Sequence, residues 1–380
     1  MGLDPETFGQ LLDAVERFVR DRLVPREDEV ERTDRVPEDV VAEMRGLGLF
    51  GLSIPEEYGG LGLSMSEEAE VAFRLGGAAP AFRSVFGTNN GIGSQGLLMD
   101  GTAEQKAKYL PRLASGEIVG SFALTEAESG SDAASLRTRA VRDGDHYVLD
   151  GAKRFITNAP HAGLFTVFAR TDRNEAGARG VSAFLVEAGT PGLTVAEPYA
   201  KMGQRGSLVA DIHLDACRVP AAQRLGPEGE GFRTAMKVLD RGRLHIAAFC
   251  VGVAARLIRD AVAYASERRQ FGRPIAEFQL VQAMLADSQA ECFAARAMVE
   301  SAARTYDAAG SATLQASCAK MFASEMVGRV ADRAVQIHGG SGYVVGLAVE
   351  RLYRDVRLFR LYEGTTQIQQ LVIAREMLRG

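Results

Sequence analysis

The sequence has little cysteine and histidine, and the few that occur are not arranged as metal ligands or as a disulfide framework. The 380 residues include 4 cysteines and 5 histidines. No C-x-x-C pair occurs, and no histidine stands at ligand spacing from a cysteine. We therefore expect free core thiols, no metal site and no disulfides. The thiols are those of Cys217, Cys250, Cys292 and Cys318.

An excess of basic residues is also absent. Lysine and arginine together number 44, against 49 aspartate and glutamate residues, which gives a net charge of -5 and a pI of about 5.7. Nucleic-acid binding usually needs a concentrated basic surface, so we expect no nucleic-acid partner. With 46% hydrophobic and 24% charged residues, the composition is that of an ordinary globular protein.

Long apolar runs and targeting signals are missing as well. The longest uncharged apolar run, residues 244–255, is well short of the roughly 18 residues that suggest a membrane span, so we expect a buried helix there. The first residues, MGLDPETF, lack the basic and apolar regions of a secretory signal and are too acidic for a typical transit peptide. These features predict a cytoplasmic protein with no membrane span.

Helical patterns dominate the chain as far as about residue 115. Asp4, Pro5 and Glu6 are a typical N-cap, first helical residue and first-turn acid, and the apolar residues between 8 and 19 follow the helical period. Residues 91–96 read G-x-G-x-x-G, the letters of a dinucleotide-binding loop. Such a loop must follow a strand, whereas both neighbours here are helical, so we expect a turn between closely packed helices.

Runs rich in β-forming residues replace the helical pattern after about residue 120. They are residues 147–149, 165–168, 181–186 and the alternating segment 210–215. Long alanine-rich helical segments follow, near residues 232–264, 278–306 and 313–337. We predict an α+β fold of three domains: an N-terminal α-helical domain (1–118), a middle β-barrel or sandwich domain (119–226) and a C-terminal four-helix-bundle domain (227–380).

Three separated segments carry groups that could do chemistry. The loop at 122–132, FALTEAESGSD, offers hydroxyls and backbone N–H groups that can converge on an electron-rich group, although it could equally be a solvated turn. In F-I-T-N, Phe155 precedes the hydroxyl of Thr157, but an aromatic at a strand end is usually a core residue. Glu363 in Y-E-G-T-T is either a base or an ordinary surface charge.

Five motifs stand in the order and spacing of one known family. They are A-L-T-E-A-E-S-G-S-D, F-I-T-N, E-R-R-Q-F-G-R-P-I with F-Q-L-V-Q, Q-I-H-G-G-S-G-Y and Y-E-G-T-T-Q-I-Q. Through them essentially the whole chain resembles the acyl-CoA dehydrogenases. The resemblance implies the three-domain fold, bound FAD and the desaturation of an acyl-CoA thioester between Cα and Cβ, as in the β-oxidation of fatty acids.

The resemblance also assigns cofactor contacts. Phe122, Leu124, Thr125, Gly130 and Ser131 would line the flavin, with Phe155, Ile156 and Thr157 beside the isoalloxazine. Arg268, Phe271 and Gln279 would belong to the FAD site of a neighbouring subunit, which implies an oligomer, expected to be a homotetramer. Gln336, Gly339, Gly340, Thr365 and Gln367 would complete the site. A planar arginine suits a pyrophosphate, although without the motif residues 267–269 would be a solvated charged face.

Glu363 would be the catalytic base. The α-proton of a thioester is weakly acidic, so its removal needs a positioned base, a stabilised carbonyl oxygen and an adjacent hydride acceptor. Burial should raise the pKa of Glu363 and make it a better base. Some family members carry the base at the position of Gly242, which cannot act as one. Substrate contacts would come from Ser131, Asp240, Arg243 and the backbone of Gly364.

The acyl group and the electron acceptor stay open. Arg83 matches an arginine that binds the distal carboxylate in the glutaryl-CoA dehydrogenase branch, but Gly87 replaces a second polar contact of that branch, and a structural salt bridge is the other explanation. Residues 127–129 and Phe155 depart from the commoner Pro-Gly-Ala and tryptophan. Electrons would pass to electron-transfer flavoprotein; a flavin oxidase and a non-catalytic acyl-CoA-binding relative are the alternatives.

Overall fold

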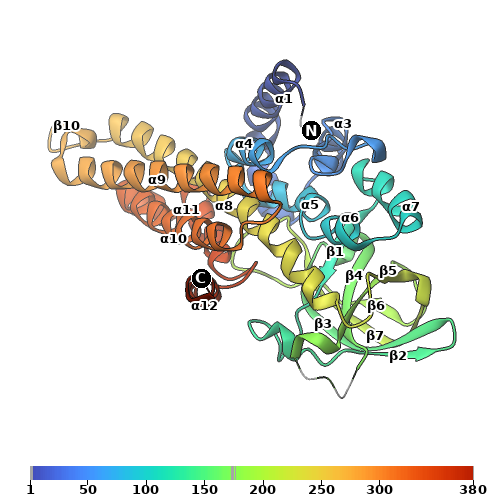
Figure 1. Ribbon diagram of the computed structural model, residues 1–380. Helices are drawn as coiled ribbons and strands as arrows, with labels where there is room; N and C mark the ends of the chain where they lie inside the picture. Colours follow the sequence, from blue (N-terminus) through green and yellow to red (C-terminus); the bar gives the residue numbers. More distant parts are fainter. Residues whose placement is uncertain (1–2, 173–174, 176, 380) are drawn as a thin grey trace.

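The computed structural model describes residues 3–172, 175 and 177–379, and its elements follow in the predicted order of helices, strands and helices (Figure 1). The first helices are α1 (Pro5–Phe18), α2 (Glu27–Thr33), α3 (Glu38–Gly46), α4 (Met65–Leu75), α5 (Pro80–Asn90), α6 (Gln95–Asp100) and α7 (Ala103–Ala114). The strands are β1 (Val119–Ala123), β2 (Arg139–Asp143), β3 (His146–Thr157), β4 (Ala162–Arg170), β5 (Val181–Glu187), β6 (Leu193–Val195), β7 (Val209–Pro220) and β8 (Arg224–Leu225). The last part contains α8 (Gly231–Glu267), the hairpin β9 (Arg269–Gln270) and β10 (Arg273–Pro274), α9 (Gln279–Ala309), α10 (Thr313–His338), α11 (Ala348–Val356) and α12 (Thr366–Arg379).

Two local predictions in the N-terminal part are confirmed. The carboxylate of Asp4 caps α1 by accepting the backbone N–H groups of Glu6 and Thr7 at 3.1 and 3.0 Å. The G-x-G-x-x-G segment is the turn between α5 and α6. A Cβ on Gly93 would lie 2.7 Å from the carbonyl oxygen of Thr88, so this glycine serves close packing.

The middle of the chain forms one sheet with strand order β6-β7-β3-β2-β4-β5-β8, and β1 pairs in parallel with β4. Ala210, Ile212 and Leu214 on β7 are buried, as their alternation predicts. One apolar cluster is built only from sheet-domain residues, whereas another packs side chains of β4 and β5 against α7 and the start of α8. The sheet is thereby anchored to helices from both ends of the chain.

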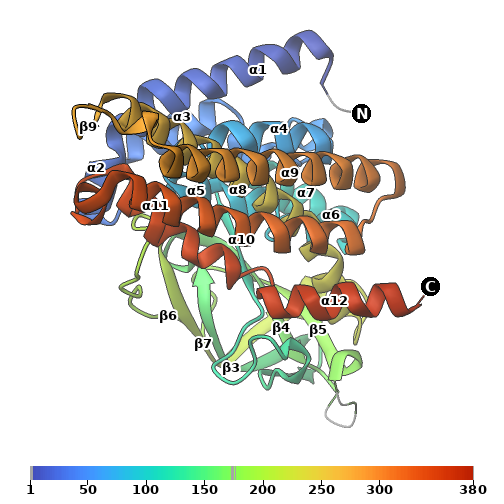
Figure 2. The same cartoon turned by 90° about the vertical axis from the view of Figure 1, so that its left-hand side faces the viewer.

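The C-terminal helices form a bundle around α8, which packs against α4, α9 and α10. Figure 2 shows α9 and α10 side by side, with α12 next to α10. Residues 244–255 lie inside α8 and all but Ala255 are buried, so the predicted buried helix is confirmed. Among the described residues, no helix is long and apolar enough to cross a membrane.

One apolar core joins the N-terminal helices to the C-terminal bundle. It contains Phe50 and Phe82 from the N-terminal part and Phe249 and Phe359 from the C-terminal part. The division into domains 1–118, 119–226 and 227–380 therefore stays a prediction, because the two helical parts do not have separate cores. Three of the four free cysteines are buried, as expected of core thiols, whereas Cys318 is half-buried.

Candidate active site

Glu363 lies in a tight turn that precedes α12. Its backbone has a φ of 56°, a left-handed conformation that costs a non-glycine residue on the order of 1 kcal/mol or more. The amide of Gln369 donates to the carbonyl oxygens of Glu363 and Gly364, both at 3.0 Å, and the ammonium of Lys320 donates to Gly364 O at 2.7 Å. The strained turn is therefore held by side chains of α10 and α12.

The carboxylate of Glu363 packs against α8 at Gly242. A Cβ on Gly242 would lie 2.7 Å from Oε2 of Glu363, so only glycine at this position leaves room for the carboxylate where it lies. Oε2 is shielded from solvent and accepts no hydrogen bond from any residue that the structure describes. Burial raises the pKa of Glu363, and the positive charges of Arg83, Arg243 and Lys320 oppose that rise.

Asp240 and Arg243, which the sequence predicted as substrate contacts, are buried together on α8. Arg243 donates from Nη1 to Oδ1 of Asp240 at 3.0 Å. Burial raises the pKa of Asp240, against hydrogen bonds from Thr313 and Arg243. Nε of Arg243 is buried and has no partner within the described residues, so this arginine keeps a free donor in the neighbourhood of Glu363.

Arg83 of α5 also belongs to this group. A Cβ on Gly87 would lie 2.7 Å from its guanidinium, so the side chain passes directly over that glycine. Arg83 forms no ion pair with any described residue, and its Nε is buried without a partner. Burial raises the pKa of Glu363 and of Tyr362, and the charge of Arg83 opposes both rises. Burial lowers the pKa of His245, and the charge of Arg83 adds to that fall. The expected alternative of a structural salt bridge is therefore wrong for the described part of the chain.

The loop after β1 is fixed at its base by a buried ion pair, whereas its tip is exposed. Lys153 of β3 is fully buried and donates to Oε1 of Glu126 at 2.7 Å and to the carbonyl of Leu124 at 3.1 Å. Glu126 in turn accepts the backbone N–H groups of Arg137 and Thr138. Phe122 and Thr125 are half-buried and Leu124 is buried, whereas Gly130 and Ser131 are exposed at the tip. The sequence reasoning missed this buried ion pair.

Phe155 is presented to solvent instead of the core. The register of β3 against β7 slips between Lys153 and Ile156, and Phe155 has a φ of 60°. Its ring is 56% exposed and lies 5.3 Å from the ring of Tyr199. The bulge therefore turns an aromatic face outward, with Ile156 buried and Thr157 half-buried beside it.

Most of the remaining predicted cofactor residues lie at the far end of the bundle, around the hairpin β9–β10 (Figure 1). The stacked rings of Tyr264 and His338, 4.2 Å apart, join the end of α8 to the end of α10 there. The predicted cofactor residues exposed at this end are Arg268, Phe271, Gln279, Gln336, Gly339 and Gly340. In Figure 1 the hairpin lies far from the sheet, so one chain does not bring the two groups of predicted cofactor residues together.

Thr365 and Gln367 instead accompany Glu363. The hydroxyl of Thr365 accepts the N–H of Ile368 at 3.2 Å in the first turn of α12, and Gln367 is exposed. Lys320 and Gln369, which hold the turn, were not predicted. The only sequence signal for Lys320 is a charged residue within the alanine-rich stretch 316–323.

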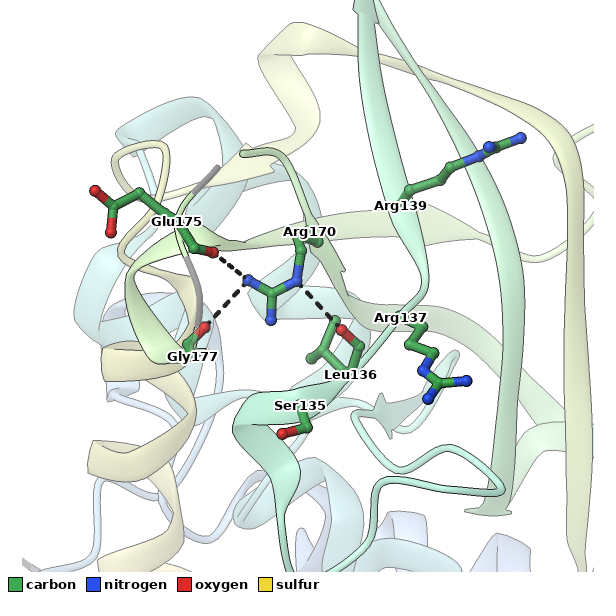
Figure 3. Close-up of a pocket in the computed structure, with 7 residues that line it drawn as sticks. All are labelled: Ser135, Leu136, Arg137, Arg139, Arg170, Glu175 and Gly177. Carbon is green, nitrogen blue, oxygen red and sulfur yellow. Dashed lines mark hydrogen bonds between the residues drawn. The ribbon is translucent and has the colours of Figure 1, made fainter. Parts of the chain in front are cut away.

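A hollow of about 450 Å³ in the middle domain is structural (Figure 3). Arg170 at its centre donates to the carbonyl oxygens of Leu136, Glu175 and Gly177. The guanidinium is therefore engaged by backbone acceptors and ties a surface loop to the sheet. Nearby, Arg137 pairs with Glu128 at 2.6 Å, which balances the charge that distinguishes residues 127–129 from the commoner motif.

Comparisons with protein-family models and with known proteins point to the same family. The models described as acyl-CoA dehydrogenase N-terminal, middle and C-terminal domains match residues 5–117, 121–217 and 229–378. A probable acyl-CoA dehydrogenase of Bacillus subtilis, YngJ, is 43% identical, with 97% of each chain covered. The caffeyl-CoA reductase-Etf complex subunit CarC of Acetobacterium woodii is 41% identical, with 93% of each chain covered.

Solved structures agree with these relatives. Butyryl-CoA dehydrogenase from Megasphaera elsdenii superposes with a TM-score of 0.95 at 34% identity, covering 100% of both chains. The structure of PigA with FAD and proline superposes with a TM-score of 0.95 at 28% identity, again covering 100% of both chains. The three-part architecture expected from the motifs thus has counterparts along the full length of solved chains.

Proposed function

Because the chain belongs to the acyl-CoA dehydrogenase family of FAD-dependent oxidoreductases, we propose that it dehydrogenates an acyl-CoA thioester to the trans-2-enoyl-CoA with Glu363 as the base. The observation that carries this proposal is the carboxylate of Glu363. Its Oε2 is shielded, has no partner among the described residues and lies within a group of cationic side chains. Such an oxygen is available to take a proton from a bound ligand.

The residues at the edge of the sheet fit the isoalloxazine of FAD. The outward ring of Phe155 offers a flat apolar face, and the Lys153–Glu126 pair holds the adjoining loop in one conformation. When bound, FAD supplies the acceptor for the hydride that leaves Cβ. The side chains and backbone that would line it are those of Phe122, Leu124, Thr125, Gly130, Ser131, Ile156 and Thr157.

Glu363 would receive the α-proton on Oε2. Burial raises the pKa of its carboxyl group, which strengthens the base, while the surrounding cations limit the rise. The backbone of Gly364 would donate to the thioester carbonyl and stabilise the charge that develops on its oxygen. Asp240, Arg243 and Ser131 would contact the remainder of the substrate.

A second copy of the chain would complete the cofactor site. Arg268, Phe271 and Gln279 are exposed at the opposite end of the bundle from the flavin loop, and Phe271 is 93% exposed. We propose a homotetramer in which this end approaches the FAD of a neighbouring subunit. Electron-transfer flavoprotein is the proposed acceptor, since a relative with 41% identity is named as a subunit of an Etf complex.

Replacement of the base tests the reaction. Glu363→Gln should retain flavin but reduce the rate of anaerobic flavin bleaching by an acyl-CoA at least about 100-fold, because a positioned general base contributes that much or more. The measurement is stopped-flow absorbance with a panel of acyl-CoAs. Bleaching of the variant at the wild-type rate would contradict the proposal.

Two further observations would favour one of the alternative functions over a dehydrogenase. A wild-type protein that turns over faster with oxygen than with ferrocenium would be a flavin oxidase. A purified protein without the flavin colour would be a non-catalytic acyl-CoA-binding relative.

A dicarboxylyl-CoA substrate is the second candidate, and the unpaired Arg83 favours it. Arg83 is half-buried with its Nε shielded and unpartnered among the described residues, and a distal carboxylate of the substrate would supply a partner for the guanidinium. Burial raises the pKa of Glu363 and the charge of Arg83 opposes that rise, so a carboxylate bound to Arg83 would lie in the neighbourhood of the base.

The ratio of two substrates isolates this contact. Arg83→Ala should reduce kcat/KM for glutaryl-CoA relative to butyryl-CoA about 10- to 100-fold, since a hydrogen bond to a charged group contributes about 1.5–3 kcal/mol. Any effect of the lost charge on Glu363 cancels in the ratio. A ratio that is the same in both enzymes would exclude the dicarboxylate.

A further inference from the structure

Lys320 is a buried cation whose charge is directed at a backbone carbonyl. It lies on α10 with no exposed surface, and Nζ donates to Gly364 O at 2.7 Å. Within the described residues it forms no ion pair, although Glu325 and Glu363 act on it electrostatically. Burial lowers its pKa to about 8. A side chain this costly to bury needs a compensating role.

The carbonyl that Lys320 contacts belongs to the strained turn at Glu363. The left-handed backbone of Glu363 must be stabilised by its surroundings. Among the described residues, only two side chains donate hydrogen bonds to the carbonyl oxygens of Glu363 and Gly364, those of Gln369 and Lys320. Gln369 follows the turn on α12 and would move with it, whereas Lys320 is anchored 44 residues earlier on α10. Lys320 therefore fixes the turn relative to the bundle.

The carboxylate of Glu363 also packs against the helical bundle. Oε2 of Glu363 would be only 2.7 Å from a Cβ on Gly242 of α8, and α8 packs directly on α10. A turn fixed to α10 is thus fixed relative to Gly242. A shift of about 1 Å in a reacting group can lower a rate by about 100-fold.

We propose that Lys320 is a positioning residue for the base: it locks the Gly364–Thr365 peptide, directly after Glu363, to α10. Its positive charge also favours the ionised carboxylate of Glu363. This inference rests on the proposed role of Glu363. The charged groups that face Glu363 are Arg83 from α5, Arg243 from α8 and Lys320 itself from α10. The charged groups that face Lys320 are Arg243 from α8, Glu325 from α10 and Glu363, and the neutral thiol of Cys250 on α8 faces it as well.

Two substitutions separate the hydrogen bond from the charge. Lys320→Met removes both, whereas Lys320→Gln removes the charge but keeps an N–H donor on a side chain that is one bond shorter. The matched control is Lys237→Met on α8, which breaks an ion pair with Asp100 at 3.4 Å outside the site. Each holoenzyme is measured for flavin content, thermal unfolding and the rate of anaerobic flavin bleaching by butyryl-CoA between pH 6 and 8.

A substrate analogue reports on proton removal without turnover. A 3-thia-acyl-CoA can lose its α-proton but has no β-hydrogen to transfer, so its deprotonated form accumulates beside the flavin and gives a charge-transfer band. We expect Lys320→Met to bleach about 100-fold more slowly at the high end of the pH range. Both Lys320 variants should need a higher pH to form the band, because a positive charge beside the base is lost. Lys320→Gln should recover the bleaching rate to within about tenfold of the wild type.

Three results would overturn the inference. One is a Lys320→Met enzyme with the bleaching rate and pH profile of the control. Another is a Lys320→Gln enzyme whose band forms with an unshifted pH profile. The last is a loss of rate that follows flavin content and thermal unfolding alone, which would make Lys320 a structural residue. If these occur while Glu363→Gln is inactive, only the role of Lys320 fails; a fully active Glu363→Gln enzyme would instead refute the proposed function.

Discussion

At the scale of single residues, the absence of a side chain at Gly242 matters as much as the presence of Glu363. The carboxylate occupies the space that a Cβ on α8 would fill. The two positions are 121 residues apart in the chain. A larger residue at position 242 would nevertheless displace the carboxylate of Glu363. A base on α8 and a base in the turn would therefore compete for one volume.

Gly242→Ala tests this exclusion. The added methyl group should displace the carboxylate and slow anaerobic flavin bleaching by about tenfold or more. Alanine is also the better helix former by about 1 kcal/mol, so stability should change little or rise. Gly9→Ala on α1, where a Cβ would meet no atom within 4 Å, is the control and should leave the rate unchanged. A Gly242→Ala enzyme with the wild-type rate would show that the turn at Glu363 can move away from α8 without loss of activity, which would contradict the exclusion.

The sequence allowed the role of Glu363 to be predicted but not the means by which the residue is held. Its role follows from the resemblance that five separated motifs carry together, which can be recognised without knowledge of the packing. The contact with Lys320 depends on how α10 packs, and no spacing in the chain reveals it. The same reason explains why a salt bridge for Arg83 was a reasonable expectation: whether an acid lies opposite depends on tertiary packing.

At the scale of elements, a buried ionic cluster joins α4 to α8. Glu68 of α4 is fully buried and accepts from Nε of Arg241 at 2.9 Å and contacts Nδ1 of His245 at 2.7 Å. Burial alone would raise the pKa of Glu68, but the charge of Arg241 and the contact with His245 lower it to about 2. The carboxylate therefore stays ionised and holds the two helices at a fixed register.

Glu68→Gln should destabilise the protein by about 3–5 kcal/mol, because it leaves the buried charge of Arg241 without its partner. Glu70→Gln, two residues along the same helix, breaks only partly exposed ion pairs and should cost about 1 kcal/mol or less. Urea unfolding at pH 7 measures both.

The same cluster predicts a dependence on pH. The folded pKa of Glu68 lies below its ordinary value of 4.5, so its contribution is complete above pH 4.5 and is lost as the pH falls toward 2. The difference in unfolding free energy between the wild type and Glu68→Gln should shrink over that interval. Equal stability of the wild type and Glu68→Gln at pH 7 would mean that Arg241 finds another partner.

The boundaries of the long elements follow closely from the sequence, whereas local irregularities do not. Few breakers interrupt α8, α9 and α10, and each helix lies within a few residues of the predicted segment. The bulge at Phe155 was not predicted, because a one-residue slip between β3 and β7 leaves no compositional trace. That slip decides whether the ring faces the core or solvent.

At the scale of the whole molecule, the predicted cofactor residues divide into two groups at distant ends of one chain. The motifs predict both groups, because a sequence motif is the same whichever subunit contributes its residues to a given cofactor site. They could not show that the groups lie apart, since that separation follows from the length and direction of the bundle helices. Phe271 and Leu280 near the hairpin are exposed, and in the proposed homotetramer a neighbouring subunit would cover them.

The core shared by the N-terminal and C-terminal helices bears on how the protein is made. During translation, α1 to α7 leave the ribosome before the sheet and well before α8, against which α4 packs. The apolar surfaces of these early helices must wait for most of the chain to be synthesised, and during that time they are open to aggregation. The middle domain has an apolar cluster of its own and could fold first. Chaperone assistance during synthesis would then be needed chiefly by the first hundred or so residues.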